Sequence, residues 1–99
     1  MRRLSSPKPP DSPRISSLTT LGQMVRARRL ASGLRLDDAA ALCGVSPDLL
    51  SRLENGRTGV SSDRLLKVLD ALGLAMLILA KESIPAEFKG REPRAEPAS

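Results

Sequence analysis

The chain of 99 residues has no histidine, tryptophan or tyrosine, and it has one cysteine, Cys43, and one phenylalanine, Phe88. Without histidine, and with one thiol, it offers no His/Cys metal cluster, no Cys/His pair and no Ser/His triad. It also lacks a glycine-rich phosphate loop. A single thiol forms no internal disulfide and fits a reducing cytoplasm. We therefore expect a cytoplasmic protein with no metal or cofactor that is not an enzyme.

The scarcity of aromatic residues also limits the kind of core that the chain can build. Aromatic residues make up 1% of the sequence, so the core has to be aliphatic and mostly leucine. The length allows one small domain, and such domains are often marginal unless they are well packed or oligomeric. Several short patterns rich in Leu and Ala predict an all-α fold.

No apolar stretch is long enough to cross a bilayer. The longest one, Leu74–Ala80, is far too short, and the arginines at the N-terminus are not followed by the apolar run of a signal peptide. We therefore expect no membrane partner. The formal net charge of +5 favours a polyanion, DNA first, through phosphate attraction and counterion release. Charge alone also fits a basic surface that only aids solubility.

The most informative stretch is Ala40–Gly56, in which two short helical patterns meet at Gly44-Val45-Ser46. Gly44 suits a left-handed turn at the end of the first helix. Ser46 is a strong N-cap for the second helix, and the proline that follows it stands at the first helical position. This arrangement predicts a helix-turn-helix, which lays its second helix in the major groove of DNA.

At these residues the chain resembles the Cro/lambda-repressor-like (Xre-type) helix-turn-helix regulators. The resemblance runs from about Leu21 to Leu74, and the order of elements is most like the HipB antitoxins. Its carriers are Arg29, Gly33-Leu34, Ala40, Gly44-Val45-Ser46, Leu50, Leu53-Glu54-Asn55-Gly56 and Leu72-Gly73-Leu74.

Four helices are expected in a domain over residues 18–73. Thr19 or Thr20 is expected to cap the first helix, which runs to about Ala31, and Ser61 or Ser62 to cap the fourth. The predicted inward-facing residues recur at helical spacing. The second helix is predicted over Arg35–Cys43 and the third over Pro47–Asn55, and the inward residues are Leu21, Val25, Cys43, Leu50, Leu53, Leu65, Val68, Leu69 and Leu72.

Residues 74–83 are predicted to form a short C-terminal strand for dimerisation. The stretch Leu74–Ala80 shows no polar alternation, so both of its faces require cover, and a lone strand exposes an unpaired edge. Pairing with the same strand of a second subunit removes that edge, and the resemblance to HipB implies the same homodimer. A fifth, dimerising helix is the alternative. The expected contact residues are Met76, Leu77, Ile78 and Leu79.

Both ends of the chain are rich in proline and polar residues. Residues 1–17 are predicted to form a flexible basic arm, which is either a minor-groove contact or a cloning or leader remnant, and residues 84–99 a disordered tail.

The resemblance implies which residues touch DNA. On the predicted recognition helix these are Asp48, Ser51 and Arg52 for bases, with Arg52 suited to fork onto a guanine. Two positions depart from the family pattern, because Arg35 and Leu36 stand where a Thr and a Gln are usual, and Pro47 offers no donor. The implied phosphate contacts are Arg35, Ser46, Asn55, Arg57 and Thr58, whereas Arg26, Arg28 and Arg64 are expected to be solvated surface charges.

The resemblance also implies an internal ion pair between Arg29 and Glu54, which would tie the first helix to the end of the third and orient the recognition helix. Desolvation offsets much of the attraction in such a pair, so it need not add much net stability.

Taken together, these features predict a homodimeric, sequence-specific repressor of a double-stranded DNA operator. The resemblance to HipB further implies the antitoxin and autoregulator of a small operon, with a HipA-like kinase toxin as partner. The alternative is a protein-interaction module that keeps the scaffold but no longer reads DNA, for which Pro47, Asp48 and Leu36 are the evidence.

Overall fold

The computed structural model describes residues 12–89 and contains four main helices. A serine side chain caps the N-terminus of three of them. Ser17, Ser46 and Ser61 accept a hydrogen bond from the backbone N–H three residues on, in α1 (Leu18–Ala31), α3 (Pro47–Glu54) and α4 (Ser62–Ala71). The expectation of a cap at Thr19 or Thr20 is therefore wrong, because both threonines lie inside the first turn of α1. The remaining main helix is α2 (Leu36–Cys43).

All four helices end in the same way. In each, a glycine with positive φ follows the last turn, and the next N–H bonds back across that turn. At the turn between α2 and α3, Gly44 has a φ of 73°, and Val45 donates its N–H to the carbonyl of Ala40 at 3.0 Å. This reverses the chain within three residues and brings α3 against α2, as the sequence predicts.

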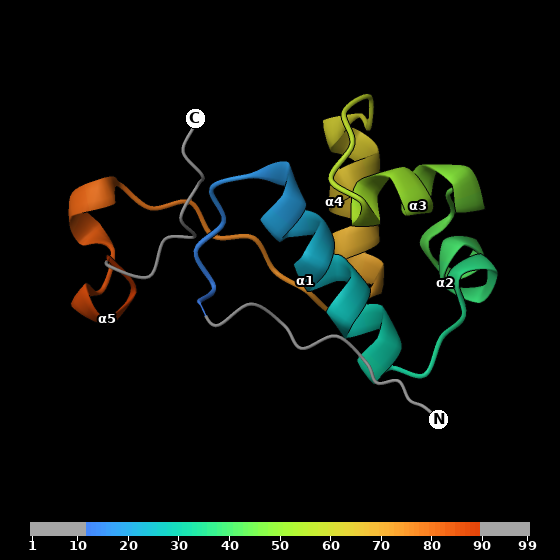
Figure 1. Cartoon of the computed structure of the whole chain (residues 1–99), viewed down its shortest axis with the longest axis horizontal. Helices are drawn as coiled ribbons and strands as arrows, with labels where there is room; N and C mark the ends of the chain where they lie inside the picture. Colours follow the sequence, from blue (N-terminus) through green and yellow to red (C-terminus); the bar gives the residue numbers. More distant parts are fainter. Residues whose placement is uncertain (1–11, 90–99) are drawn as a thin grey trace.

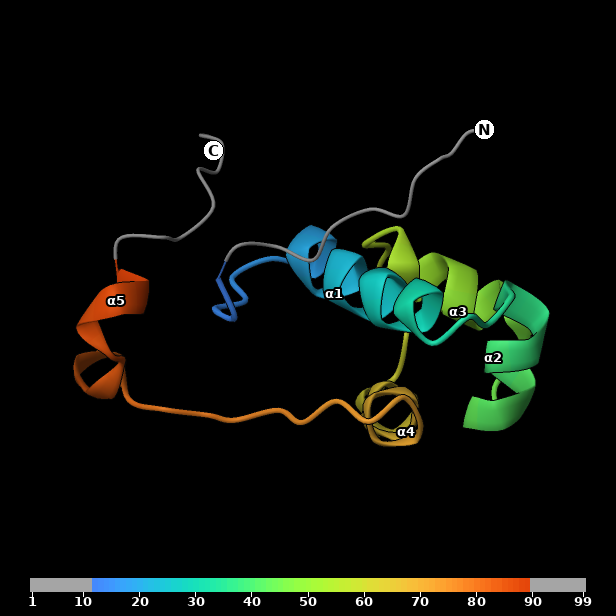
Figure 2. The ribbon, with the colours of Figure 1, turned by 90° about the horizontal axis from the view of Figure 1, so that it is seen from below.

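The core lies where the four helices meet, and it is aliphatic as expected (Figure 1). Val25, Leu50 and Val68 are its largest fully buried side chains. Cys43 lies in the same cluster, and its burial raises the pKa of the thiol, which favours the inert, protonated form. Figure 2 shows α4 seen end-on beneath α1 and α3.

The helices α1 and α3 approach each other backbone to backbone. A Cβ added at Gly22 of α1 would lie 2.4 Å from the carbonyl oxygen of Leu53 and 2.5 Å from that of Glu54. A Cβ at Gly56 would likewise lie 2.8 Å from Cα of Thr19. The two glycines therefore let the N-terminal half of α1 rest directly on the end of α3.

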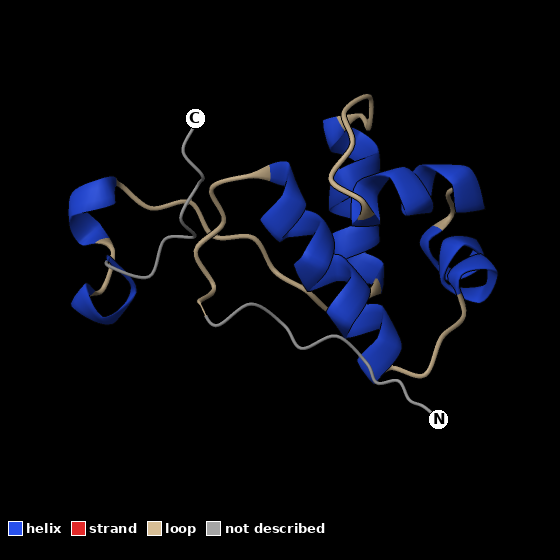
Figure 3. Ribbon diagram, in the orientation of Figure 1, coloured by secondary structure: helices blue, strands red, loops and turns tan. Residues whose placement is uncertain are grey.

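After α4, residues 74–80 run as an extended segment towards η1 (Lys81–Ser83) and α5 (Ala86–Lys89), as Figure 2 shows. Leu77 and Ile78 are 80% and 89% exposed, which fits a segment that needs a partner. No helix forms between α4 and η1. Within residues 12–89 there is also no strand (Figure 3), and since a strand of this kind requires a second subunit, the dimerisation strand stays a prediction.

The structure describes only part of the two predicted terminal segments. Most of the predicted N-terminal arm and residues 90–99 of the predicted tail lie outside the described residues. The short helix α5 falls within the segment read as a disordered tail, and sequence patterns did not indicate it. Among the described helices, none is both long and apolar enough to cross a membrane.

Candidate nucleic-acid interface

The helix α3 has one buried and one exposed face. Leu49, Leu50, Leu53 and Glu54 are buried, whereas Pro47 and Asp48 are exposed and Ser51 and Arg52 half-buried. The second set, continued by the exposed Asn55, follows the helical spacing i, i+1, i+4, i+5, i+8. One side of α3 is thus anchored in the protein and the other is available to a partner.

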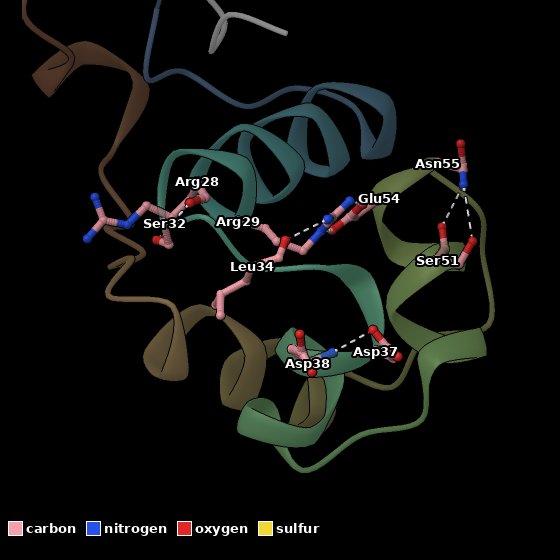
Figure 4. A network of polar contacts seen from close by, with 9 residues as sticks. All are labelled: Arg28, Arg29, Ser32, Leu34, Asp37, Asp38, Ser51, Glu54 and Asn55. Atoms are coloured by element: carbon pink, nitrogen blue, oxygen red, sulfur yellow. Dashed lines mark hydrogen bonds and ion pairs between the residues drawn. The ribbon is translucent and has the colours of Figure 1, made fainter. Parts of the chain in front are cut away.

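The anchored side is held by an ion pair with α1. Arg29 donates Nε to Oε2 of Glu54 at 2.6 Å and Nη2 to Oε1 at 2.8 Å, a bidentate arrangement (Figure 4). Arg29 also donates Nη1 to the carbonyl of Leu34 at 3.0 Å. The hydrogen bonds to Glu54 raise the pKa of Arg29 and outweigh the opposing effect of burial. One arginine of α1 thereby positions both the end of α3 and the entry to α2.

On the exposed face, Asp48 and Arg52 pair with each other. Nε of Arg52 lies 3.3 Å from Oδ2 of Asp48, one helical turn away, and Nη1 donates to the carbonyl of Gly59 at 3.4 Å. The Nε atom is itself buried and makes no hydrogen bond of good geometry. Both contacts are long and solvent-exposed in part, so they hold the guanidinium weakly. Arg52 can exchange them for a partner at little cost.

The residues expected at phosphates come from the two ends of α3, the loop after it and the start of α2. Ser46 accepts the N–H of Leu49 at 3.1 Å, and its hydroxyl hydrogen remains available to a second acceptor. Asn55 donates Nδ2 to the carbonyl of Ser51 at 2.8 Å, which fixes its amide at the end of α3 (Figure 4). Nε of Arg35 lies 3.7 Å from Oδ1 of Asp37, and this exposed ion pair constrains the arginine side chain little. Arg57 and Thr58 are exposed in the loop after α3.

An open cleft of about 480 Å³ lies beside the start of α3. It separates the turn at Gly44-Val45-Ser46 from the start of α4, and Arg52 and Arg64 both line it. The N-terminal ends of α3 and α4, with their partial positive charge, border the same space. Two arginines and two helix N-termini therefore meet at this cleft, while the first turns of the two helices also carry Asp48 and Asp63. Arg64 is exposed, as the sequence predicts, and its place in the same cleft as Arg52 depends on how α3 and α4 are packed.

Arg28, which was also predicted to be a solvated surface charge, makes a contact that the sequence did not indicate. Its Nε donates to the carbonyl of Leu72 at the end of α4 at 2.8 Å, so it is not only a solvated surface charge. The two residues are far apart in the sequence, and no local pattern connects them.

Residues 12–89 hold no group of three or more His, Cys, Asp or Glu side chains that could bind a metal ion.

Comparison with known proteins agrees with this geometry. A family model described as a helix-turn-helix domain matches residues 20–76. A search of curated protein sequences finds no match.

Several solved structures are similar to this chain. The clp gene regulator ClgR from C. glutamicum is 39% identical, with a TM-score of 0.54 over 63% of this chain and 80% of its own. The restriction-modification controller protein C.AhdI from Aeromonas hydrophila is 33% identical, with a TM-score of 0.54 over 59% of this chain and 84% of its own. HipB, in a HipA-HipB-O2-O3 complex, is 24% identical, with a TM-score of 0.61 over 68% of this chain and 94% of its own, a likeness of fold.

Proposed function

The chain belongs to the Cro/lambda-repressor-like (Xre-type) helix-turn-helix family of DNA-binding regulators, and on that premise we propose that it is a sequence-specific transcriptional repressor that binds its operator as a homodimer. The observation that carries the proposal is the division of α3 into an anchored face and an exposed polar face. A helix held in this way is rigid enough to read base edges, because its register is set by the bidentate pair with Arg29.

The proposal assigns base contacts to Asp48, Ser51 and Arg52. Arg52 leaves its weak contacts with Asp48 and Gly59 and forks onto O6 and N7 of a guanine. Asp48, released from Arg52, accepts from N4 of a cytosine. The ion pair of the unbound protein thus keeps the Asp48 carboxylate from repelling DNA until a matching base pair replaces it.

Arg35, Ser46, Asn55, Arg57 and Thr58 are assigned to phosphates. Ser46 and Asn55 are the cap residues at the two ends of α3, Arg57 and Thr58 lie in the loop after it, and Arg35 is the N-cap residue at the start of α2. Contacts of this kind fix the orientation of the protein on the duplex without selecting a sequence.

Dimerisation is assigned to residues 74–83. Met76, Leu77, Ile78 and Leu79 are all exposed, and an extended apolar segment with a free edge pairs readily with a second copy of itself. A two-fold dimer then reads a pseudo-palindrome whose half-sites lie about one helical turn apart.

The finer role that we propose is antitoxin and autoregulator of a toxin-antitoxin operon, with a HipA-like kinase toxin as protein partner. Its support is the similarity of fold to HipB, which occurs in complex with HipA. Co-expression with the product of an adjacent kinase-like gene, followed by co-purification, tests this role separately from DNA binding. Absence of such a neighbour would leave a plain repressor.

Selection of bound sequences from a random duplex pool, followed by affinity measurements over a series of salt concentrations, tests the main proposal. We expect a palindromic motif and a steep decrease of affinity with salt, since each phosphate contact releases about 0.9 counterion. The rival function, a protein-interaction module, is favoured by the mutual neutralisation of Asp48 and Arg52. No duplex binding at low salt would establish the rival and refute the repressor.

A further inference from the structure

Two consecutive arginines of α1 hold two different helices. Arg29 pairs with Glu54 at the end of α3, and Arg28 donates Nε to the carbonyl of Leu72 at the end of α4. Figure 4 shows the two side chains leaving α1 in different directions. The helix that anchors the proposed recognition helix is therefore also bound to the point where the chain leaves the helical domain.

The end of α4 has a carbonyl that accepts a hydrogen bond from Arg28. Gly73 donates its N–H to the carbonyl of Asp70 at 3.1 Å, and Leu74 donates to that of Leu69 at 2.8 Å. These bonds occupy two of the carbonyls that a helix end leaves without a partner within the helix. The carbonyl of Leu72 follows these two in the chain, and it accepts from Nε of Arg28 at 2.8 Å. The end of a helix carries partial negative charge, which favours a cation at this position.

Gly73 leaves room for the guanidinium of Arg28. A Cβ at residue 73 would lie 2.8 Å from Nη2 of Arg28, and the φ of 78° at this residue disfavours any side chain. The glycine thus ends the helix and leaves room for the guanidinium over the turn. Arg28, Leu72 and Gly73 together define one contact, which we name the α1–α4 latch.

We propose that Arg28 is a positioning residue that sets the direction in which residues 74–80 leave the domain, and thereby the half-site spacing that the dimer prefers. This inference rests on the proposed function, because spacing has meaning only if two subunits bind DNA together. In that dimer each recognition helix is held to α1, and α1 is held by the latch to the start of the segment that pairs with the second subunit. Loosening the latch alters the distance between the two reading surfaces while leaving each surface intact.

The test compares Arg28→Met with the matched control Arg26→Met. Both changes remove one positive charge from α1, and Arg26 is an exposed residue of the same helix. Affinity is measured for the selected operator, for operators with one or two base pairs inserted or deleted at the centre, and for an isolated half-site. We expect Arg28→Met to reduce discrimination between spacings by roughly tenfold, the scale of one hydrogen bond to a charged group. Half-site affinity should match that of Arg26→Met.

Hydrogen exchange of the full chain without DNA provides a second readout. In Arg28→Met the amides of Gly73 and Leu74 should exchange faster, whereas those of α3 should keep their protection. Unchanged exchange at Gly73 and Leu74 would overturn the latch. Faster exchange with an unchanged spacing preference would overturn its role in spacing.

Failure of the proposed function gives a different result from failure of the latch. If the parent protein binds no duplex, the repressor proposal and the spacing role are both refuted, although exchange at Gly73 still reports on the contact itself. If the parent binds and Arg28→Met discriminates between spacings as well as Arg26→Met does, only the inference about Arg28 is wrong.

Discussion

Arg29 and Glu54 are buried, unlike the other charged side chains whose exposure the structure describes. Glu54→Ala would strand the guanidinium of Arg29 in a site from which water is largely excluded. Losing one partner of a buried pair typically costs about 3–5 kcal/mol of unfolding free energy. We expect a loss of that order in chemical denaturation, and partial recovery when Arg29 is also replaced by Met. A Glu54→Ala variant as stable as the parent would contradict the importance of the pair.

Arg52 is expected to act on specificity. Arg52→Ala should weaken binding to the selected operator by about 1–3 kcal/mol and relax the preference at one base pair in each half-site. The reason is its position on the exposed face of α3, with only long contacts to Asp48 and Gly59. Repeating the selection with the variant measures both effects. An unchanged motif with unchanged affinity would remove Arg52 from the base-reading residues.

Arg57 should behave differently, because it lies in the loop after α3, where we propose that it contacts a phosphate. Arg57→Ala should weaken binding to all duplexes to a similar extent and reduce the magnitude of the salt slope by about 1. Fluorescence anisotropy with one selected and one scrambled duplex measures both quantities. A loss confined to the selected duplex would instead indicate base reading by Arg57.

Among the helices, the crossing of α1 over α3 depends on the missing side chain at Gly22. An alanine normally stabilises a helix interior by about 1 kcal/mol relative to glycine. Here its Cβ would meet two backbone carbonyls at 2.4 and 2.5 Å, which cannot move aside as a side chain would. We expect Gly22→Ala to destabilise the protein by about 1–3 kcal/mol despite its better propensity. The exposed Gln23→Ala on the same helix is the control and should change stability by less than about 0.5 kcal/mol.

The existence and order of the four helices were predictable because their signals are local. Ser46 and Pro47 begin α3, Gly44 ends α2, and Leu50 and Leu53 repeat at helical spacing. The cap of α1 was placed wrongly because Ser17, the stronger cap by residue type, was assigned to the N-terminal arm, so the predicted helix began too late. The role of Gly22 left only a weak signal, a glycine inside a helical pattern.

For the whole molecule, the proposed dimer depends on residues 74–80. Ile78→Pro removes a backbone donor and would prevent regular pairing if that N–H lies in the ladder. We expect the variant to sediment as a monomer at micromolar concentration and to lose operator affinity, since each monomer then holds one half-site. Ile78→Val keeps the donor and should dimerise like the parent. A monomeric parent, or a dimer insensitive to Ile78→Pro, would refute this interface.

The sequence by itself determined the family, the four helices and the residues that face the core, because caps, glycine ends and apolar spacing act over a few neighbouring positions. The partner of Arg29 also came from the sequence, but only through the resemblance to known regulators. The tertiary structure alone decided that Arg28 reaches Leu72, that Arg64 and Arg52 share one cleft, and that Gly22 touches the backbone of α3. These contacts join distant parts of the chain, and their geometry depends on how whole helices pack, which no local pattern encodes.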